Sequence, residues 1–298
     1  MRKIAATLII LLFLPAYVHS WGEKGHLLIN QLAIEKASPV LPEFMAAGRN
    51  QLIYDGYEPD RWREEFNTPM NTAQAADHFF DSELWGPIST IEPDRYAFME
   101  RVAAKKVELV KIGYLPYAII ETYGRVRNAF RQWRNAKTPE EREAARINAL
   151  VYAGILGHYV GDGSNPMHLS IHYDAWLPTT PNPKGFRTAK GLHSQFEALY
   201  VNQAVKTTDV ASSVKVPQRL PDVFASIKDY LSQSFSDLDT LYALEKGGDL
   251  NPSDPRRQGT EFVDRELGRG ATMLGNLWYT AWLESAEPAA PPRRGGQQ

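Results

Sequence analysis

The chain of 298 residues is 43% hydrophobic and 23% charged, a composition that is typical of a globular protein and excludes large-scale disorder. Its 33 basic and 35 acidic residues nearly balance, so the net charge does not indicate a broad surface for nucleic acid. The absence of cysteine excludes disulfides and a lipid-modified cysteine anchor.

The amino-terminal segment before Trp21 has the pattern of a secretory signal peptide. Basic residues precede an apolar run over residues 4–14, Pro15 ends this run, and Val18 and Ser20 stand three and one positions before Trp21. We expect cleavage at this point and export to the periplasm or the outside of the cell. The run is too short to span a bilayer as a mature helix, so we expect no transmembrane segment.

Helical periodicity recurs along the rest of the chain, and no stretch alternates cleanly enough to indicate a sheet. The sequence predicts an all-α fold in one domain over residues 21–286, with exposed loops at 177–190 and 248–259 and a disordered tail over 287–298. Besides a central helix, the pattern predicts helices over residues 25–35, 96–111, 115–133, 192–204, 222–246 and 262–284.

The central helix is the clearest element. Thr138 can cap its start, with Glu141 completing a capping box, and Gly163 follows its end. Because His158 and Asp162 continue an apolar stripe, we expect both to point into the core, where an unpaired carboxylate would be costly. The stripe consists of Ile147, Val151, Gly154, His158 and Asp162.

Histidines recur in five short segments, and four of these segments also contain carboxylates. In two of them a histidine and a carboxylate lie four residues apart on a predicted helix, so that both can bind one cation or two neighbouring cations. Zinc favours such mixed nitrogen and oxygen ligands. His172 lacks a carboxylate at helical spacing, and we expect it on a loop or at a pocket rim. The segments are WGEKGH at 21–26, DHFFD at 77–81, HYVGD at 158–162, NPMH at 165–168 and HSQFE at 193–197.

In these segments, together with EPDRW at 58–62, the chain resembles the three-zinc phosphoesterases, a family that includes zinc-dependent phospholipase C and the single-strand nucleases S-one and P-one. The resemblance covers most of the mature chain in order and implies the multi-helix fold of that family with three zinc ions. It implies a first zinc held by Asp60, His78, His158 and one oxygen of Asp162. A second, more open zinc would be held by His168, His193 and Glu197. A third would be held by the other oxygen of Asp162, by His26, and by the amino nitrogen and carbonyl oxygen of Trp21.

The resemblance also implies hydrolysis of phosphate esters. A water activated between the first and third zincs would attack phosphorus in line, and Asp60 would orient this water or accept its proton. Arg63 stands where the nuclease branch carries a basic phosphate clamp, although an exposed helix charge is an equal alternative. Phe79 and Asp81 could stack on and hydrogen-bond a base, although Phe79 could equally belong to the core.

The choice of substrate depends on a few positions. Glu197, where the nuclease branch usually has Asp, points toward phospholipase C. Lys24 and Arg61 replace an acidic and an aromatic residue of the family's lipase, and a choline cation would need such groups. We therefore expect single-stranded nucleic acid or nucleotides as substrate. Phospholipid is the alternative, and a non-catalytic zinc-binding protein is an alternative of another class.

Overall fold

The computed structural model describes residues 21–63 and 68–287. Within these ranges the chain forms helices and connecting loops without a strand, which confirms the all-α prediction. The predicted signal peptide and the tail beyond Glu287 lie outside the described residues. None of the described helices is both long enough and apolar enough to cross a membrane.

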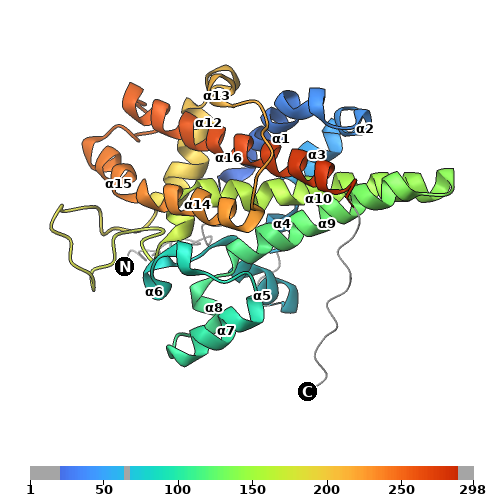
Figure 1. Ribbon diagram of the computed structural model, residues 1–298. Coiled ribbons are helices and arrows are strands. Elements are labelled where there is room, and N and C mark those ends of the chain that lie inside the picture. The colour runs from blue at the N-terminus through green and yellow to red at the C-terminus, as the bar shows by residue number, and fades with distance from the viewer. Residues whose placement is uncertain (1–20, 64–67, 288–298) are drawn as a thin grey trace, which may run out of the picture.

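Two long helices form the centre of the structure. Helices α9 (Leu115–Asn135) and α10 (Pro139–Ser164) form a hairpin, and their joined end projects beyond the other helices (Figure 1). Helices α1 (Gly22–Ala37), α3 (Arg49–Asp55) and α16 (Arg257–Glu284) pack against α10. Buried apolar side chains from all five helices belong to one hydrophobic cluster.

The start of α10 agrees with its predicted capping. Thr138 Oγ1 accepts a hydrogen bond from Glu141 N at 3.1 Å, and Glu141 Oε2 accepts one from Lys137 N at 2.7 Å. The predicted apolar stripe is wrong at its first position, because Ile147 is 48% exposed on the projecting part of the hairpin. The buried residues on either side of it in the helix are Ala145 and Ala149, which lie on another face.

Glycines on α10 let the neighbouring helices approach closely. A Cβ atom at Gly154 would lie 2.5 Å from Asp55 Cβ, and one at Gly161 would lie 2.8 Å from His26 Nδ1. Real Cβ atoms do not tolerate such distances, so α1 and α3 occupy space that side chains would otherwise fill. The close approach brings His26 beside the buried end of α10.

Three predicted helices are not single regular α-helices in the structure. The segment 96–111 forms α7 (Arg95–Ala104) and α8 (Leu109–Ile112), and Lys106 between them has a φ of 59°. The segment 192–204 is helical throughout but changes its winding. It consists of α11 (Leu192–Ser194), the π-helical η5 (Gln195–Tyr200) and α12 (Val201–Ala204).

The segment 222–246 divides at Asp237 into α14 (Val223–Ser236) and α15 (Leu238–Gly247). The Asp237 carboxylate accepts hydrogen bonds from Arg269 at 2.7 Å and Arg265 at 3.3 Å, both on α16. These tertiary contacts hold the chain at the break, which explains why the periodic apolar pattern alone predicted one continuous helix.

Short helices connect the long ones. Their lengths give too few turns for a hydrophobic period, and the sequence did not predict them. They are η1 (Ser38–Val40), α2 (Glu43–Ala47), α4 (Glu58–Arg61), α5 (Pro69–Ala75), η2 (Ala76–His78), α6 (Ser82–Trp85), η3 (Ile88–Thr90), η4 (Pro166–Leu169) and α13 (Thr207–Ser213).

The two predicted loops are only partly exposed. Residues 177–190 contain no helix, but Phe186 is buried, with its ring centroid 5.0 Å from that of Trp176. The second predicted loop is too long, because α16 already begins at Arg257. Gly259 is buried there, and a Cβ atom on it would overlap the carbonyl oxygen of Asp249.

Candidate metal centre

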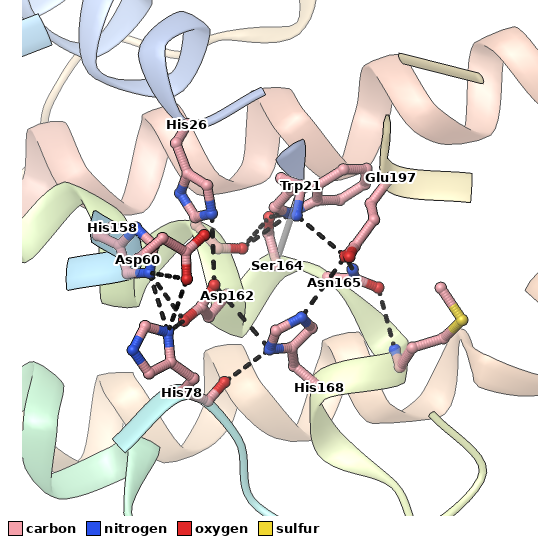
Figure 2. A network of polar contacts seen from close by, with 12 residues as sticks. Trp21, His26, Asp60, His78, His158, Asp162, Ser164, Asn165, His168 and Glu197 are labelled. Atoms are coloured by element: carbon pink, nitrogen blue, oxygen red, sulfur yellow. Dashed lines mark hydrogen bonds and ion pairs between the residues drawn. The ribbon is translucent and has the colours of Figure 1, made fainter. Parts of the chain in front are cut away.

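The side chains that the sequence singled out as metal ligands converge from separate elements, and Figure 2 shows most of them around Asp162. Each lies on the buried side of its element. At most 6% of any of these residues is exposed, and the residues are Trp21, His26, Asp60, His78, His158, Asp162, His168, His193 and Glu197.

Asp162 lies at the centre, and its two carboxylate oxygens face different partners. His78 Nδ1 lies 3.1 Å and His158 Nε2 lies 3.5 Å from Asp162 Oδ2. On the other side, His26 Nε2 lies 3.5 Å from Oδ1. The His26 and His158 rings stack with centroids 4.0 Å apart. One carboxylate therefore joins two groups of nitrogen ligands.

Asp60 lies at the edge of this cluster, on the short helix α4. Its Oδ1 lies 3.7 Å from His78 Nδ1, 3.8 Å from His158 Nε2 and 3.3 Å from the Arg63 guanidinium. Burial raises the pKa of Asp60 to about 7, and Arg63 acts in the opposite direction. Arg63 is therefore in contact with the site, with 24% of its side chain exposed.

A second group contains His168, His193 and Glu197. His193 Nε2 lies 2.8 Å from Glu197 Oε1, and His168 Nε2 lies 3.6 Å from Oε2. Glu197 Oε2 also accepts hydrogen bonds from Trp21 N at 3.0 Å and Asn165 Nδ2 at 3.1 Å. Trp21 N thus contacts the second group directly, through Glu197.

Backbone carbonyls orient three of the imidazole rings. A carbonyl can only accept, so each contact assigns the proton to Nδ1 and leaves Nε2 for the cluster. This arrangement is common for metal-binding histidines. The contacts are His158 Nδ1 to Gly56 O at 3.0 Å, His168 Nδ1 to His78 O at 2.6 Å and His193 Nδ1 to Tyr173 O at 2.8 Å.

The buried charges of the cluster fit a divalent cation. Burial lowers the pKa values of His78 and His158 well below the usual range, which keeps both rings neutral and able to bind a metal. Burial, with a contribution from Asp60, raises the pKa of Asp162, and neither oxygen of Asp162 has a hydrogen-bond partner among the described residues. A metal ion would remove the cost of burying this carboxylate.

The ligand atoms form three groups that could each hold a metal ion. Within each group they lie within 4.8 Å of one another. The groups are His26 with His158 and Asp162, Asp60 with His78 and His158, and His168 with His193 and Glu197.

The Trp21 side chain is fixed in a buried socket. Its indole Nε1 donates to Gly161 O and Ser164 Oγ, each at 2.8 Å, and Trp21 has a φ of 35°. A Cβ atom at Gly25 would lie 2.9 Å from Trp21 Cβ, so the second glycine of WGEKGH has a packing role. This socket holds the Trp21 backbone beside Glu197.

The other predicted residues differ in their positions. Phe79 is partly buried and packs against the hydrophobic cluster. Asp81 is partly exposed, and burial followed by the charge of Glu83 raises its pKa to about 7. His172 is not a rim residue. It is 5% exposed, it stacks on Trp176 with centroids 3.9 Å apart, and its Nδ1 accepts a hydrogen bond from Leu177 N.

Sequence reasoning missed the groups that orient the ligands. Asn165 bonds to Glu197 and also caps η4, and an Asn before a Pro is a recognisable turn and capping signal. The carbonyls of Gly56 and Tyr173 carry no side-chain signal, because every residue has a carbonyl.

The described residues thus form an all-α protein with buried groups that could hold metal ions. No protein-family model matches the chain, and no curated protein matches it. The chemistry of the site must therefore be inferred from its own side chains.

Proposed function

We propose that this protein is an exported, zinc-dependent phosphodiester hydrolase that acts on single-stranded nucleic acid or nucleotides. The observation that carries the proposal is the convergence of buried imidazoles on the two oxygens of Asp162, with Asp60 and Arg63 at the edge. The ordered resemblance of the histidine segments to the three-zinc phosphoesterases supports the same reaction class.

Zinc is one of the metals that this donor set suits, because imidazoles and carboxylates make up all the side-chain ligands. We propose three ions. The two faces of Asp162 would each serve one ion, and the His168, His193 and Glu197 group would hold another. Trp21 N, 3.0 Å from Glu197 Oε2, is close enough to the cluster to contribute a ligand once it is a free amine.

When bound, zinc would make a water acidic near neutral pH and attract the phosphate. Asp60 would accept or hold the proton of the attacking water, because its carboxylate lies beside the imidazole nitrogens that would hold the metal. Arg63 would contact the phosphate, because its NH1 bonds to Asp60 and its Nε has no hydrogen-bond partner among the described residues.

Arg61 supports a nuclease over a choline phospholipase. Its guanidinium carbon lies 4.1 Å from the ring centroid of Tyr54 and 5.2 Å from that of Tyr57, so it covers aromatic faces that a choline cation would need. Lys24 does not bear on the choice between nuclease and phospholipase. Its ammonium caps the end of α12 by donating to Val201 O and Val205 O, both at 3.0 Å.

The test compares purified protein that begins at Trp21 on single-stranded DNA, RNA and phosphatidylcholine, with zinc and with a chelator. We expect zinc-dependent cleavage of the nucleic acids. Cleavage of phosphatidylcholine alone would reject the nuclease. Zinc binding without turnover of any of the three would instead indicate a zinc-binding protein.

A further inference from the structure

Asn30 is a fully buried polar residue on α1 that contacts both α3 and α10. Its Nδ2 donates to Leu52 O at 2.5 Å and to Gly154 O at 3.0 Å. Both partners are carbonyls, so only the amide nitrogen can face them, which determines the orientation of the side chain. The two N–H groups of Asn30 thus join three helices at one point.

Two glycines provide the space for this amide. A Cβ atom at Gly157 would overlap Asn30 Oδ1, and one at Gly56 would lie 2.7 Å from Asn30 Nδ2. Asn30 Oδ1 has no hydrogen-bond donor among the described residues. The amide is therefore held by its two donated hydrogen bonds and by the backbone of both glycines.

Gly56 connects this contact to the candidate metal centre. Its carbonyl oxygen lies 3.0 Å from His158 Nδ1, and Asp60 follows four residues later. We propose that Asn30 is a positioning residue for this part of the centre. By supporting Gly56, it determines the orientation of the His158 ring and the position of Asp60. This inference rests on the proposed function, because it requires these side chains to bind a metal ion.

The second ligand group provides an internal comparison. His168 and His193 are oriented by the carbonyls of His78 and Tyr173, not by α3. Loss of the Asn30 amide would let the end of α3, from Leu52 to Gly56, move relative to α10 without loosening those two anchors. The expected defect is therefore selective, whereas a general loss of stability would affect every ion.

The test uses Asn30→Ala and Gly157→Ala in the chain that begins at Trp21, with Asn276→Ala as the matched control. Asn276 Oδ1 accepts a hydrogen bond from Gln218 N at 2.7 Å on the outer part of α16. Zinc affinity is measured by competition with a chromophoric chelator. The cobalt-substituted absorption spectrum and the ¹⁵N shifts of His158 report on the site itself. We expect both variants to bind one ion about tenfold more weakly, with altered cobalt and His158 signals and the other ions retained.

The outcomes separate this inference from the proposed function. Absence of metal in the unaltered protein would reject the proposed function. Normal metal binding with unchanged affinity and spectra in both variants would reject only the role of Asn30, as would an equal loss at every ion. If Asn30→Ala does not fold, Gly157→Ala decides, because it keeps both amide hydrogen-bond donors while displacing Asn30.

Discussion

Two features of the Arg63 guanidinium, one hydrogen bond and one nitrogen left unpartnered by the described residues, distinguish it from an exposed charge on a helix. Its NH1 bonds to the Asp60 carboxylate at 3.3 Å, while its Nε has no partner among the described residues. A guanidinium can hold a carboxylate with one edge and a phosphate oxygen with another. The side chain therefore has the donors that a transition-state contact requires.

We predict that Arg63→Ala lowers kcat/KM on single-stranded DNA about 100-fold, the usual effect of losing one transition-state hydrogen-bond donor. Bound zinc should change little, because Arg63 contributes no metal ligand. Arg257→Ala, at an exposed position paired with Glu261, is the control. Steady-state kinetics and elemental analysis check both variants, and normal kinetics in Arg63→Ala would assign Arg63 to the protein surface.

Asp81 provides a pH-dependent prediction away from the metal ligands. Burial, followed by the charge of Glu83, raises its pKa from 3.8 to about 7. A raised folded-state pKa means that the contribution of Asp81 to stability is complete below pH 3.8 and is lost as the pH rises to about 7. Asp81→Asn removes this loss. The melting temperature of Asp81→Asn minus that of the unaltered protein should therefore be larger at pH 8 than at pH 5.

Thermal denaturation of the zinc-loaded proteins at both pH values measures this difference. Asp254→Asn, at an exposed loop position, is the control. A parallel response of Asp81→Asn and the unaltered protein would mean that Asp81 ionises in the folded protein as it does in the unfolded chain.

At the scale of helices, the packing of α1 against α10 depends on the absence of side chains. Gly161 faces His26 and Ile29, and a Cβ atom there would lie 2.8 Å from His26 Nδ1 and 3.2 Å from Ile29 Cδ1. Neither neighbour can move far, because both are fully buried. Helix separation and ligand position are therefore determined by the same glycine.

We predict that Gly161→Ala destabilises the protein by about 1–3 kcal/mol through overpacking and also weakens metal binding by displacing His26. Gly124→Ala on α9 is the matched control, because a Cβ atom there would meet no other atom within 4 Å. The control should be neutral or more stable by up to about 1 kcal/mol, since alanine favours a helix more than glycine does. Urea denaturation of both variants decides between these outcomes.

The sequence predicted the long helices because their periodic patterns are local. Breaks such as the one at Asp237 depend on arginines of another helix, and no local pattern contains that information. The His158 and Asp162 pair and the His193 and Glu197 pair could be recognised from their helical spacing, and the resemblance supplied the rest of the proposed ligand set. His172 lies on a loop, as one of its two predicted placements had it, but its burial was not predicted because it depends on stacking with Trp176.

At the scale of the whole molecule, the proposed ions would neutralise a buried acidic cluster. Asp60, Asp162 and Glu197 are each at most 2% exposed, and burial raises the pKa values of the first two. Without a metal, the folded protein favours a protonated Asp162. The contribution of this carboxyl group to stability therefore declines as the pH rises above 3.8, its pKa in the unfolded chain. The metal-free protein should therefore be least stable at alkaline pH.

We predict that a chelator lowers the melting temperature and that this decrease is larger at pH 8 than at pH 5.5. Each ion with free metal at a thousandfold excess over its Kd stabilises the folded state by about 4 kcal/mol. Calorimetry with a chelator, followed by added zinc, measures the effect and its reversal. A melting temperature unchanged by chelation at both pH values would contradict a structural contribution of the metals.

The proposed cleavage before Trp21 leads to a separate prediction. An amine binds zinc only when it is deprotonated, and a free α-amino group has a pKa of about 8. A peptide nitrogen is not available as a zinc ligand. Protein that begins at Trp21 should therefore hold one more zinc, and be more active, than protein with extra residues before Trp21. Elemental analysis of the two forms tests this. Equal zinc content and activity would exclude the amine as a ligand.

The carbonyl contacts of His158, His168 and His193 have a consequence for how this chain can diverge. Peptide oxygens are kept through any substitution that leaves the backbone in place, so point mutation at residues 56, 78 or 173 cannot delete an anchor by changing its chemistry. Insertions and deletions can remove an anchor, because they shift the backbone and bring a different carbonyl oxygen, or none, to the imidazole ring. Between Tyr173 and His193 the chain crosses a long surface loop whose two ends are joined by such a contact. Homologous chains should therefore vary most at the exposed positions of this loop, while keeping the buried Phe186 and both ends in register.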